Sequence, residues 1–416
     1  MKTVIIGTGP AGITTAETIR RYDPDAELVL LTTEHWAPYS PPAMADHFLT
    51  GRREPLFWKG EDVAERLGAT ELRGVRVTDV TPATHEVTLS DGRTLGYDSL
   101  VLASGSRLHA PLPGIELAGI HDFKSLDAAE RIIAAVRAGD VRSVIVVGCG
   151  FIGVELALLL SDLGVTVTVL GRRGWVMPRM LDPQTAAIAE EAIRERGVDL
   201  RLGVPASAFV GDETVAGVEL ADGTVLTADA YLAATGVKPH VEYLTGSGIG
   251  MDWGVQVDDR LRTDASDVYA AGDVAEAADR MTGERYVHAI FPNAVNQGQV
   301  VAQNILGIDT AYAGAESMNS LKHLGIPIVS IGAMTGDDQL RWQEGQAMRT
   351  VWLVGGRIVG CRLAGEIAGA GVYRTLMLRG DDVRRYGKRL VDPSFGPGDL
   401  ALLAVFPGIS GWPQVA

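Results

Sequence analysis

Two glycine-rich segments with identical spacing are the residues of this chain best suited to chemistry. They follow the pattern Gly-x-Gly-x-x-Gly and consist of Gly7-Thr8-Gly9-Pro10-Ala11-Gly12 and Gly148-Cys149-Gly150-Phe151-Ile152-Gly153. In this pattern the first glycine makes a strand-to-helix turn, the second lets the backbone approach a pyrophosphate, and the third allows the helix to pack closely on the strand. The phosphates then lie at the helix N-terminus, where amide donors and the positive end of the helix dipole converge. The spacing therefore predicts two dinucleotide-binding sites in one chain.

The residues that follow the first glycine segment indicate which dinucleotide it binds. An apolar run over residues 27–31 is followed by Glu34, about 20 residues beyond the last glycine of the pattern. At this place a carboxylate can accept hydrogen bonds from both hydroxyl groups of an adenosine ribose. The first site is therefore expected to bind FAD.

The second glycine segment is followed by basic residues where the first has an acid. The apolar run over residues 165–170 ends with Gly171-Arg172-Arg173, so no carboxylate is available for a free ribose 2′-hydroxyl. Arginine forks bind phosphate groups bidentately, which favours NADPH over NADH at this site. The alternative is that Arg172 and Arg173 are solvated surface charges and that selectivity between the two nucleotides is loose.

The elements that must position these residues indicate an α/β fold. Apolar runs at 3–6 and 143–147 precede the glycine segments as strands, and helical periodicity follows each of them. Further strands are expected at 218–220 and 225–227, which form a hairpin, and at 230–234. Beyond residue 308, runs at 349–354 and 357–361 are joined by Gly355-Gly356, which suits a tight β-hairpin turn.

The order of the motifs predicts three domains. Two Rossmann-like dinucleotide-binding domains are expected to be followed by a C-terminal α+β interface domain. The predicted bounds are 1–112 and 236–307 for a discontinuous FAD-binding domain, 113–235 for the inserted NAD(P)-binding domain, and 308–416 for the interface or dimerisation domain.

Composition narrows the class of protein. The chain has 416 residues and a net charge of -15, which disfavours a general nucleic-acid binder because such proteins need a basic surface. No apolar run reaches the roughly 18 to 20 residues of a membrane-spanning helix, and no signal segment precedes the first strand, so a cytoplasmic location is expected. The two cysteines form no C-x-x-C pair, and the eight histidines show no metal-ligand spacing, so no metal site is expected.

Three further segments resemble signatures of the two-dinucleotide flavoprotein family. They are Val101-Leu102-Ala103-Ser104-Gly105-Ser106-Arg107, Ala233-Ala234-Thr235-Gly236-Val237-Lys238-Pro239 and Asp267-Val268-Tyr269-Ala270-Ala271-Gly272-Asp273. This family of FAD-dependent pyridine nucleotide oxidoreductases includes ferredoxin and rubredoxin reductases, NADH oxidases, the flavin half of assimilatory nitrite reductases and the apoptosis-inducing factors. The resemblance extends over residues 1 to about 310.

The resemblance implies further residues at the flavin. It assigns Asp273, after Gly272, to a ribityl hydroxyl of FAD. It also implies that Phe291, Pro292 and Asn293 begin a helix whose N-terminus points at the flavin pyrimidine edge, although Phe291 could instead be a core residue. Its remaining cofactor-binding residues are Ala103, Ser104, Gly105, Arg107 and Gly236.

Phe151 and Glu155 are the candidate catalytic residues on the nicotinamide side. They are four residues apart and therefore share one face of the helix that is expected to open at Gly153. In the family that this chain resembles, the aromatic stacks beside the flavin and moves when nicotinamide enters, while the glutamate approaches the carboxamide. Helix-to-sheet packing for Phe151 and a solvated first-turn acid for Glu155 are the alternatives.

The segment over residues 38–46 departs from the family pattern. Ferredoxin reductases carry an arginine and then a lysine here, and oxidases, peroxidases and coenzyme A disulfide reductases carry a redox-active cysteine. This chain has neither, which disfavours thiol chemistry. Tyr39 and Ser40 are expected to line the flavin edge.

These features predict an FAD-dependent NAD(P)H:acceptor oxidoreductase. The electrons would pass to a small iron-sulfur carrier such as ferredoxin, or to a partner oxidoreductase subunit. A stand-alone oxidase or diaphorase that reduces oxygen or a quinone is one alternative, and a nucleotide-sensing interaction module is another. A homodimer is possible, and a locally basic segment over residues 374–389 could dock an acidic ferredoxin or be a solvated face.

Overall fold

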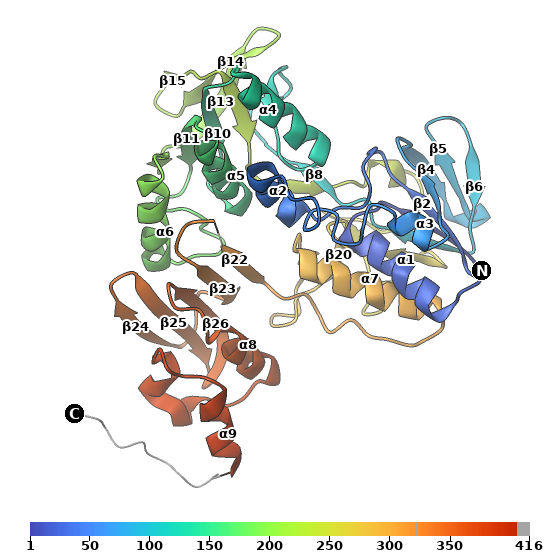
Figure 1. Cartoon of the computed structure of the whole chain (residues 1–416). Coiled ribbons are helices and arrows are strands. Elements are labelled where there is room, and N and C mark those ends of the chain that lie inside the picture. Colours follow the sequence, from blue (N-terminus) through green and yellow to red (C-terminus); the bar gives the residue numbers. More distant parts are fainter. Residues whose placement is uncertain (322, 406–416) are drawn as a thin grey trace. The chain divides into compact units, whose positions relative to one another are not determined.

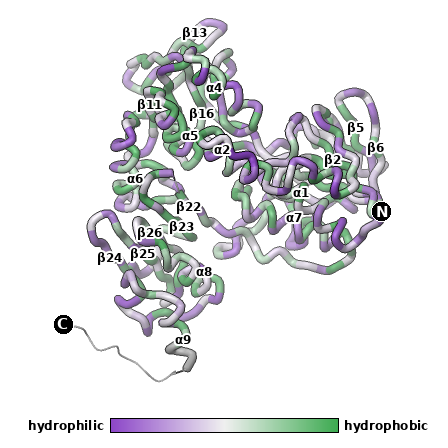
Figure 2. The backbone as a smooth tube through the Cα atoms, viewed as in Figure 1, coloured by the Kyte–Doolittle hydropathy of each residue, from purple (hydrophilic) through white to green (hydrophobic). Residues whose placement is uncertain are grey.

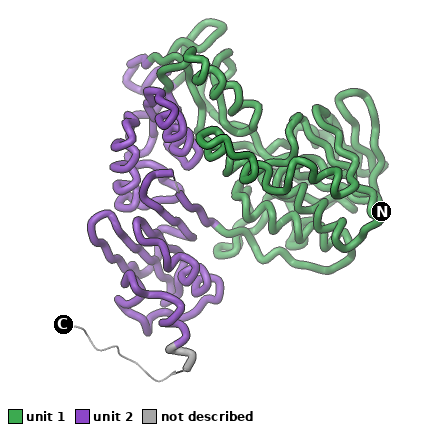
Figure 3. The backbone as a smooth tube through the Cα atoms, in the orientation of Figure 1, with its two compact units in different colours: residues 1–144, 208–217, 227–316 green, residues 145–207, 218–226, 317–416 purple. Residues whose placement is uncertain are grey.

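The computed structural model describes residues 1–321 and 323–405, which form the mixed α/β structure that the sequence predicts (Figure 1). The chain divides into two units (Figure 3). Unit 1 contains residues 1–144, 208–217 and 227–316, and unit 2 contains residues 145–207, 218–226 and 317–416. No helix in the described ranges is long and apolar enough to cross a membrane.

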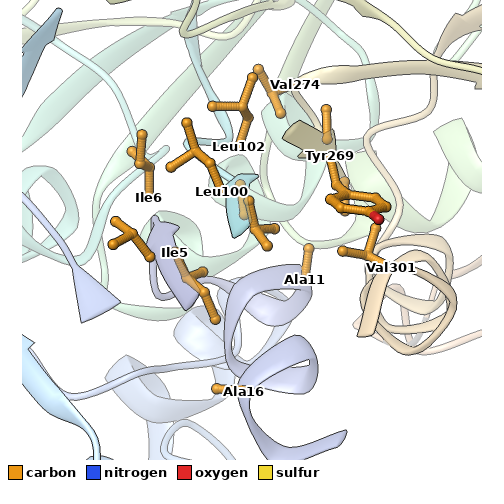
Figure 4. Close-up of a cluster of buried hydrophobic side chains, with 14 of the residues drawn as sticks. Ile5, Ile6, Ala11, Ala16, Leu100, Leu102, Tyr269, Val274 and Val301 are labelled. Atoms are coloured by element: carbon orange, nitrogen blue, oxygen red, sulfur yellow. The ribbon is translucent and has the colours of Figure 1, made fainter. Parts of the chain in front are cut away.

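A five-stranded parallel sheet organises unit 1. Its strand order is β19-β7-β1-β2-β3, and its members are β1 (Lys2–Ile6), β2 (Glu27–Leu31), β3 (Thr70–Leu72), β7 (Ser99–Leu102) and β19 (Val268–Ala270). Residues 4–6 of the central strand β1 are buried, as expected for a parallel strand covered on both faces. Figure 4 shows side chains from β1, β7, β19 and two helices meeting in this core.

Those two helices are α1 (Pro10–Tyr22), which follows the first glycine segment, and α7 (Phe291–Ile305). They pack closely because α7 has a glycine at the crossing. A Cβ atom on Gly298 would lie 2.4 Å from the carbonyl oxygen of Ala11. Thr15 Oγ1 donates at 2.9 Å to that carbonyl and at 3.1 Å to the carbonyl of Gly298.

Unit 1 also contains smaller elements. The antiparallel sheets have the orders β4-β5-β6, β17-β8 and, with one parallel pair, β18-β20-β21. Their strands and the neighbouring elements are β4 (Val77–Thr81), β5 (Glu86–Leu89), β6 (Thr94–Gly96), β8 (Ser106–Leu108), β17 (Val237–Pro239), β18 (Val255–Gln256), β20 (Ala275–Ala278), β21 (Arg285–Val287), α2 (Met44–Thr50), α3 (Val63–Arg66) and α4 (Leu126–Ala138). The side chain of Ser125 caps α4 by accepting a hydrogen bond from the amide of Ala128.

The second glycine segment also lies between a buried strand and a helix. The strand order of its sheet is β12-β11-β10-β16-β9, with β9 (Ile120–His121), β10 (Ser143–Val147), β11 (Thr166–Gly171), β12 (Asp199–Leu202) and β16 (Ala230–Ala233). Helices α5 (Phe151–Asp162) and α6 (Pro183–Glu195) follow β10 and β11 in the chain. A third sheet contains β13 (Ala206–Gly211), β14 (Val215–Leu220) and β15 (Val225–Leu226), and the β14–β15 pair confirms the predicted hairpin.

The C-terminal part of unit 2 is an antiparallel sheet with helices. Its order is β22-β23-β26-β25-β24, with β22 (Met318–Leu321), β23 (Ile328–Gly332), β24 (Asp338–Glu344), β25 (Ala347–Val354) and β26 (Arg357–Ala364), followed by α8 (Ala370–Arg379) and α9 (Pro397–Val405). Gly355 and Gly356 join β25 to β26 with φ angles of 57° and 78°, so the predicted hairpin turn is confirmed. Hydrophobic residues recur along these strands (Figure 2) and form a separate core.

Candidate functional site

In the first glycine turn of unit 1, two of the three glycines have no space for a side chain. The third borders open space. Gly7 has φ +104°, and a Cβ there would lie 2.1 Å from the carbonyl oxygen of Ala103. A Cβ on Gly12 would lie 2.0 Å from the carbonyl oxygen of Gly7, whereas one on Gly9 would meet nothing within 4 Å. Gly9 precedes α1, whose first amides have no side-chain cap. The N-terminus of α1 is therefore open to an anionic group such as a pyrophosphate.

Glu34 lies beyond the end of β2, as the sequence predicts, and has one unused oxygen. Its Oε1 accepts a hydrogen bond from the hydroxyl of Tyr39 at 3.1 Å. Its Oε2 is buried and has no hydrogen-bond partner in the described part of the chain. Burial raises the pKa of this carboxyl above its usual value, which the hydrogen bond from Tyr39 opposes. A buried acceptor left without a donor is unfavourable, and the hydroxyls of an adenosine ribose would supply donors. The site therefore fits FAD.

Changing Glu34 to glutamine is expected to weaken FAD binding about tenfold, because one charge-assisted hydrogen bond is lost while the size of the side chain is kept. Titration of the apoprotein with FAD, followed by quenching of flavin fluorescence, measures this affinity. Glu27→Gln, at the exposed start of the same strand β2, is the matched control and should leave the affinity unchanged. Equal affinities for Glu34→Gln and the unaltered protein would contradict the assignment.

Tyr39 and Ser40 are held by the backbone of distant segments. The hydroxyl of Tyr39 accepts a hydrogen bond from the amide of Leu126 at 3.0 Å, while it donates to Glu34. Burial raises the pKa of Tyr39 well above its usual value, so the phenol stays protonated as a donor. Ser40 is buried, and its amide donates to the carbonyl of Leu56 at 2.8 Å. Tyr39 thereby connects Glu34 to the start of α4.

Asp273 lies at the centre of a polar cluster at the end of β19. Its Oδ2 accepts hydrogen bonds from Ser106 Oγ at 2.6 Å and from Lys124 Nζ at 2.9 Å. Gly272 has φ +79°, and its amide donates to Gln297 Oε1 at 2.7 Å. Ser106 lies in the signature over residues 101–107 without a predicted role, and the sequence does not predict Lys124 or Gln297 as site residues. For Lys124 the available signal is a basic residue directly before the Ser-x-x cap of a helix, and this signal is weak.

The other predicted flavin residues differ in what their atoms contact. Two of them have side chains bonded to other residues of the protein, and two are glycines that offer only their backbone. Ser104 Oγ donates to the carbonyl of His240 at 2.9 Å, and Arg107 forms an exposed ion pair with Glu242. The side chains of these two residues are therefore engaged by the protein itself. At Gly105, with φ +69°, a Cβ would meet nothing within 4 Å, so the backbone there borders open space. The carbonyl of Gly236 accepts the amide of His109 at 2.9 Å.

Helix α7 begins at Phe291, as the resemblance implies. No side chain caps its first turn, and Pro292 occupies one of the first two helical positions. Asn293 is buried, and its amide group exchanges two 3.1 Å hydrogen bonds with the backbone of Glu316, which anchors the helix start. The ring of Phe291 meets Trp58 edge-on at 5.1 Å. The positive end of this helix dipole is thus available to a negative charge.

The second glycine turn repeats the geometry of the first. Gly148 has φ +122°, and Gly150 precedes α5 with an extended backbone and no side-chain cap. A Cβ on Gly150 would meet nothing within 4 Å. Helix α5 begins at Phe151, which is earlier than the expected start at Gly153, because the extended Gly150 already accepts the amide of Val154 at 3.0 Å.

Phe151 and Glu155 are both half-buried on α5, one helical turn apart, whereas Ile152 is 41% exposed. Residues four positions apart on a helix lie on one face. The two candidate catalytic side chains therefore share a face of α5, and Ile152 lies at a different position around the helix.

Arg172 and Arg173 follow β11 as exposed side chains. Neither forms a salt bridge within the described residues, so both guanidinium groups are available to a phosphate. A Cβ on the preceding Gly171 would lie 2.7 Å from Cys149 Sγ and 2.7 Å from Leu202 Cδ2. An acid at position 171 would therefore require the side chains of Cys149 and Leu202 to move.

The two cysteines are free and buried. Burial raises the pKa of Cys361 to about 12 and also raises the pKa of Cys149. Because the thiolate is the reactive form, both thiols are poor nucleophiles at neutral pH.

Comparison with known proteins links this geometry to a family. Residues 1–298 match the family described as pyridine nucleotide-disulphide oxidoreductase. The chain is 29% identical over 394 residues to an NADH oxidase of Methanocaldococcus jannaschii, with 88% of each chain covered. It is 29% identical over 401 residues to the epsilon subunit of the NADH-dependent phenylglyoxylate dehydrogenase of Aromatoleum evansii, with 94% of each covered. The reductase in a covalent putidaredoxin reductase–putidaredoxin complex shares its fold with a TM-score of 0.85 and 25% identity, over 97% of this chain and 98% of that one.

Proposed function

The chain belongs to the pyridine nucleotide-disulphide oxidoreductase family, and on this premise we propose that it is an FAD-dependent NAD(P)H:acceptor oxidoreductase. The observation that carries the proposal is the pair of glycine turns, each leading into an uncapped helix N-terminus. The buried, unpartnered Oε2 of Glu34 supports FAD at the first of them. Disulphide chemistry is disfavoured, since the free thiols Cys149 and Cys361 are buried with raised pKa values.

The proposed reaction needs binding and orientation from the protein, because the cofactor carries the chemistry. Bound FAD would accept a hydride from the nicotinamide and release electrons to an acceptor. In unit 1, Glu34 would bind the adenosine ribose, Asp273 a ribityl hydroxyl, and the α7 N-terminus would favour negative charge on the pyrimidine ring. In unit 2, Phe151 and Glu155 would position the nicotinamide. We assign residues 1–112 and 236–307 to FAD binding and 113–235 to NAD(P) binding.

NADPH is the proposed preferred donor. The two exposed arginines and the absence of an acid over residues 171–173 support it. The similar proteins of Methanocaldococcus jannaschii and Aromatoleum evansii carry NADH in their names, which supports use of NADH as well. The proposal is therefore a preference, with both nucleotides accepted.

A protein partner is the proposed electron acceptor, either an iron-sulfur carrier of the ferredoxin kind or another subunit of a larger oxidoreductase. The match to a dehydrogenase epsilon subunit over 94% of both chains supports a partner subunit. The similarity to a reductase linked to putidaredoxin supports a carrier. An oxidase that reduces oxygen is the second candidate, because the similar Methanocaldococcus jannaschii protein is named an NADH oxidase.

The basic segment over residues 374–389 offers little support for docking an acidic carrier. Three of its arginines form ion pairs with nearby aspartates, namely Arg379 with Asp381, Arg384 with Asp382, and Arg389 with both Asp392 and Asp399. These pairs neutralise much of the local positive charge. The docking surface is therefore not assigned to this segment.

We also propose that the protein acts in the cytoplasm and forms a homodimer. The two unpaired cysteines agree with a reducing compartment. The antiparallel sheet β22–β26 lies in the region that forms the dimer interface in many members of the family.

The acceptor is tested by comparing two assays of the same purified holoprotein. Oxygen consumption with NADPH alone measures the oxidase reaction, and reduction of cytochrome c with NADPH and an added [2Fe–2S] ferredoxin, without oxygen, measures carrier reduction. We expect slow oxygen consumption and fast, ferredoxin-dependent cytochrome c reduction. Fast oxygen consumption with no effect of ferredoxin would favour the oxidase.

A further inference from the structure

The two arginines proposed to bind the 2′-phosphate lie at the start of an irregular segment between β11 and α6. We call residues 172–182 the arginine loop. Its middle is bonded to the second glycine turn, since the amide of Met177 donates to the carbonyl of Cys149 at 2.8 Å and Cys149 Sγ lies 3.8 Å from the carbonyl of Trp175. The arginine loop is therefore attached to the dinucleotide site itself.

The later part of the arginine loop is held by the C-terminal sheet, which belongs to the same unit. The carbonyl of Met180 accepts hydrogen bonds from Ser330 Oγ on β23, at 2.9 Å, and from Arg362 Nε on β26. Arg341 on β24 donates to Asp182 Oδ1 at 3.3 Å. Residues of three strands, at least 150 positions away in the chain, thus form hydrogen bonds with Met180 and Asp182 of this loop.

Arg362 is a charged residue that is almost completely buried, which is unusual for a side chain with only a structural role. It is 1% exposed, and its other donors bind the carbonyls of Ile331 at 2.8 Å, Gly332 at 3.0 Å and Cys361 at 2.8 Å. Its guanidinium also lies over the ring of Trp352, 5.3 Å from the centroid. No carboxylate within the described residues forms an ion pair with it. A buried charge without an ion-pair partner is costly, and the hydrogen bonds of this guanidinium, all to backbone carbonyls, hold the side chain in one geometry.

Arg349, on the adjacent strand β25, provides a contrast. It is also fully buried, with 0% exposure, and donates to Tyr373 Oη at 3.4 Å and to the carbonyl of Asp392 at 2.9 Å. Both partners lie in the C-terminal part of the chain. Arg349 therefore stabilises the same sheet without a hydrogen bond to the arginine loop.

We propose that Arg362 and Ser330 are positioning residues for nucleotide selectivity. By fixing the carbonyl of Met180, they hold the arginine loop in the conformation in which Arg172 and Arg173 meet a 2′-phosphate. A loop that is already ordered loses less conformational entropy when a ligand binds to it. Only NADPH carries the 2′-phosphate that contacts the arginines of this loop, so the ordered loop strengthens the binding of NADPH and not that of NADH. The inference rests on the proposed role of Arg172 and Arg173.

The test uses holoprotein carrying Ser330→Ala, which removes one hydrogen bond to Met180, and Arg362→Met, which removes the other. We expect the KM for NADPH to rise about threefold to tenfold in each, with kcat and the KM for NADH little changed. Hydrogen–deuterium exchange of the nucleotide-free holoprotein should become faster over residues 175–182. Arg349→Met is the control, and it should lower the melting temperature without changing the NADPH to NADH ratio.

An unchanged KM ratio in Ser330→Ala would overturn the proposal, even if Arg362→Met does not fold. An equal change of the ratio in Arg349→Met would also overturn it, because general loosening of the sheet would then be the cause. The variant Arg172→Ala/Arg173→Ala separates this inference from its premise. If that variant loses selectivity and Ser330→Ala does not, only the inference fails; if neither does, the premise fails.

Discussion

Replacing Asp273 with alanine is expected to yield protein that is purified with little or no flavin and binds added FAD on the order of 100-fold more weakly. The carboxylate accepts hydrogen bonds from Ser106 and Lys124, and we propose that it also binds a ribityl hydroxyl. The change removes that acceptor and leaves the lysine, which is 26% exposed, without its counter-ion. Two effects therefore act in the same direction.

Flavin content after purification and titration of the apoprotein with FAD measure this effect. Asp252→Ala is the control, since Asp252 is exposed in the same unit and its side chain forms no salt bridge in the described ranges. The double variant Asp273→Ala/Lys124→Met separates the two effects, because it removes the unpaired charge while the acceptor is still missing. A yellow Asp273→Ala protein with unaltered FAD affinity would remove Asp273 from the site.

Replacing both Arg172 and Arg173 with alanine is expected to lower kcat/KM for NADPH on the order of 100-fold and to change kcat/KM for NADH less than about threefold. Each guanidinium is exposed and free of salt bridges in the described part of the chain, so its removal costs little stability. The lost interactions are those with the 2′-phosphate, which NADH lacks. The preference should therefore shift toward NADH.

Steady-state kinetics with both nucleotides at constant ionic strength check this expectation. Arg201→Ala, on the neighbouring strand β12, removes an exposed arginine that pairs with Asp199 and should leave the ratio unchanged. If the double variant keeps its NADPH to NADH ratio, Arg172 and Arg173 are solvated surface charges.

The features of the fold and of the site that the sequence predicts depend on residues that are close together in the chain. The φ angles of Gly7 and Gly148 and the open space at Gly9 and Gly150 follow from a spacing of a few residues. The place of Glu34 beyond the end of β2 is predictable in the same way, because the distance from the glycine turn to the end of the next strand is nearly constant in this fold.

The residues that sequence reasoning missed depend on contacts between distant segments. Lys124 reaches Asp273 across 149 positions, and Arg362 reaches Met180 across 182. No periodicity or motif marks either pair, since each is brought together only by the folded structure. The start of α5 was missed for a different reason, because an extended glycine can precede a helix with no side-chain cap.

The central claim, that nicotinamide nucleotides reduce a flavin bound to this chain, is tested most directly by anaerobic stopped-flow absorbance of the holoprotein. NADPH and NADH are mixed separately with the enzyme, and the absorbance of the flavin near its visible maximum is followed over time. We predict that both nucleotides bleach the band within seconds of mixing. The rate of bleaching should reach half its maximum at a lower concentration of NADPH than of NADH. A band that stays unbleached with both nucleotides would contradict the assignment as an NAD(P)H-dependent oxidoreductase.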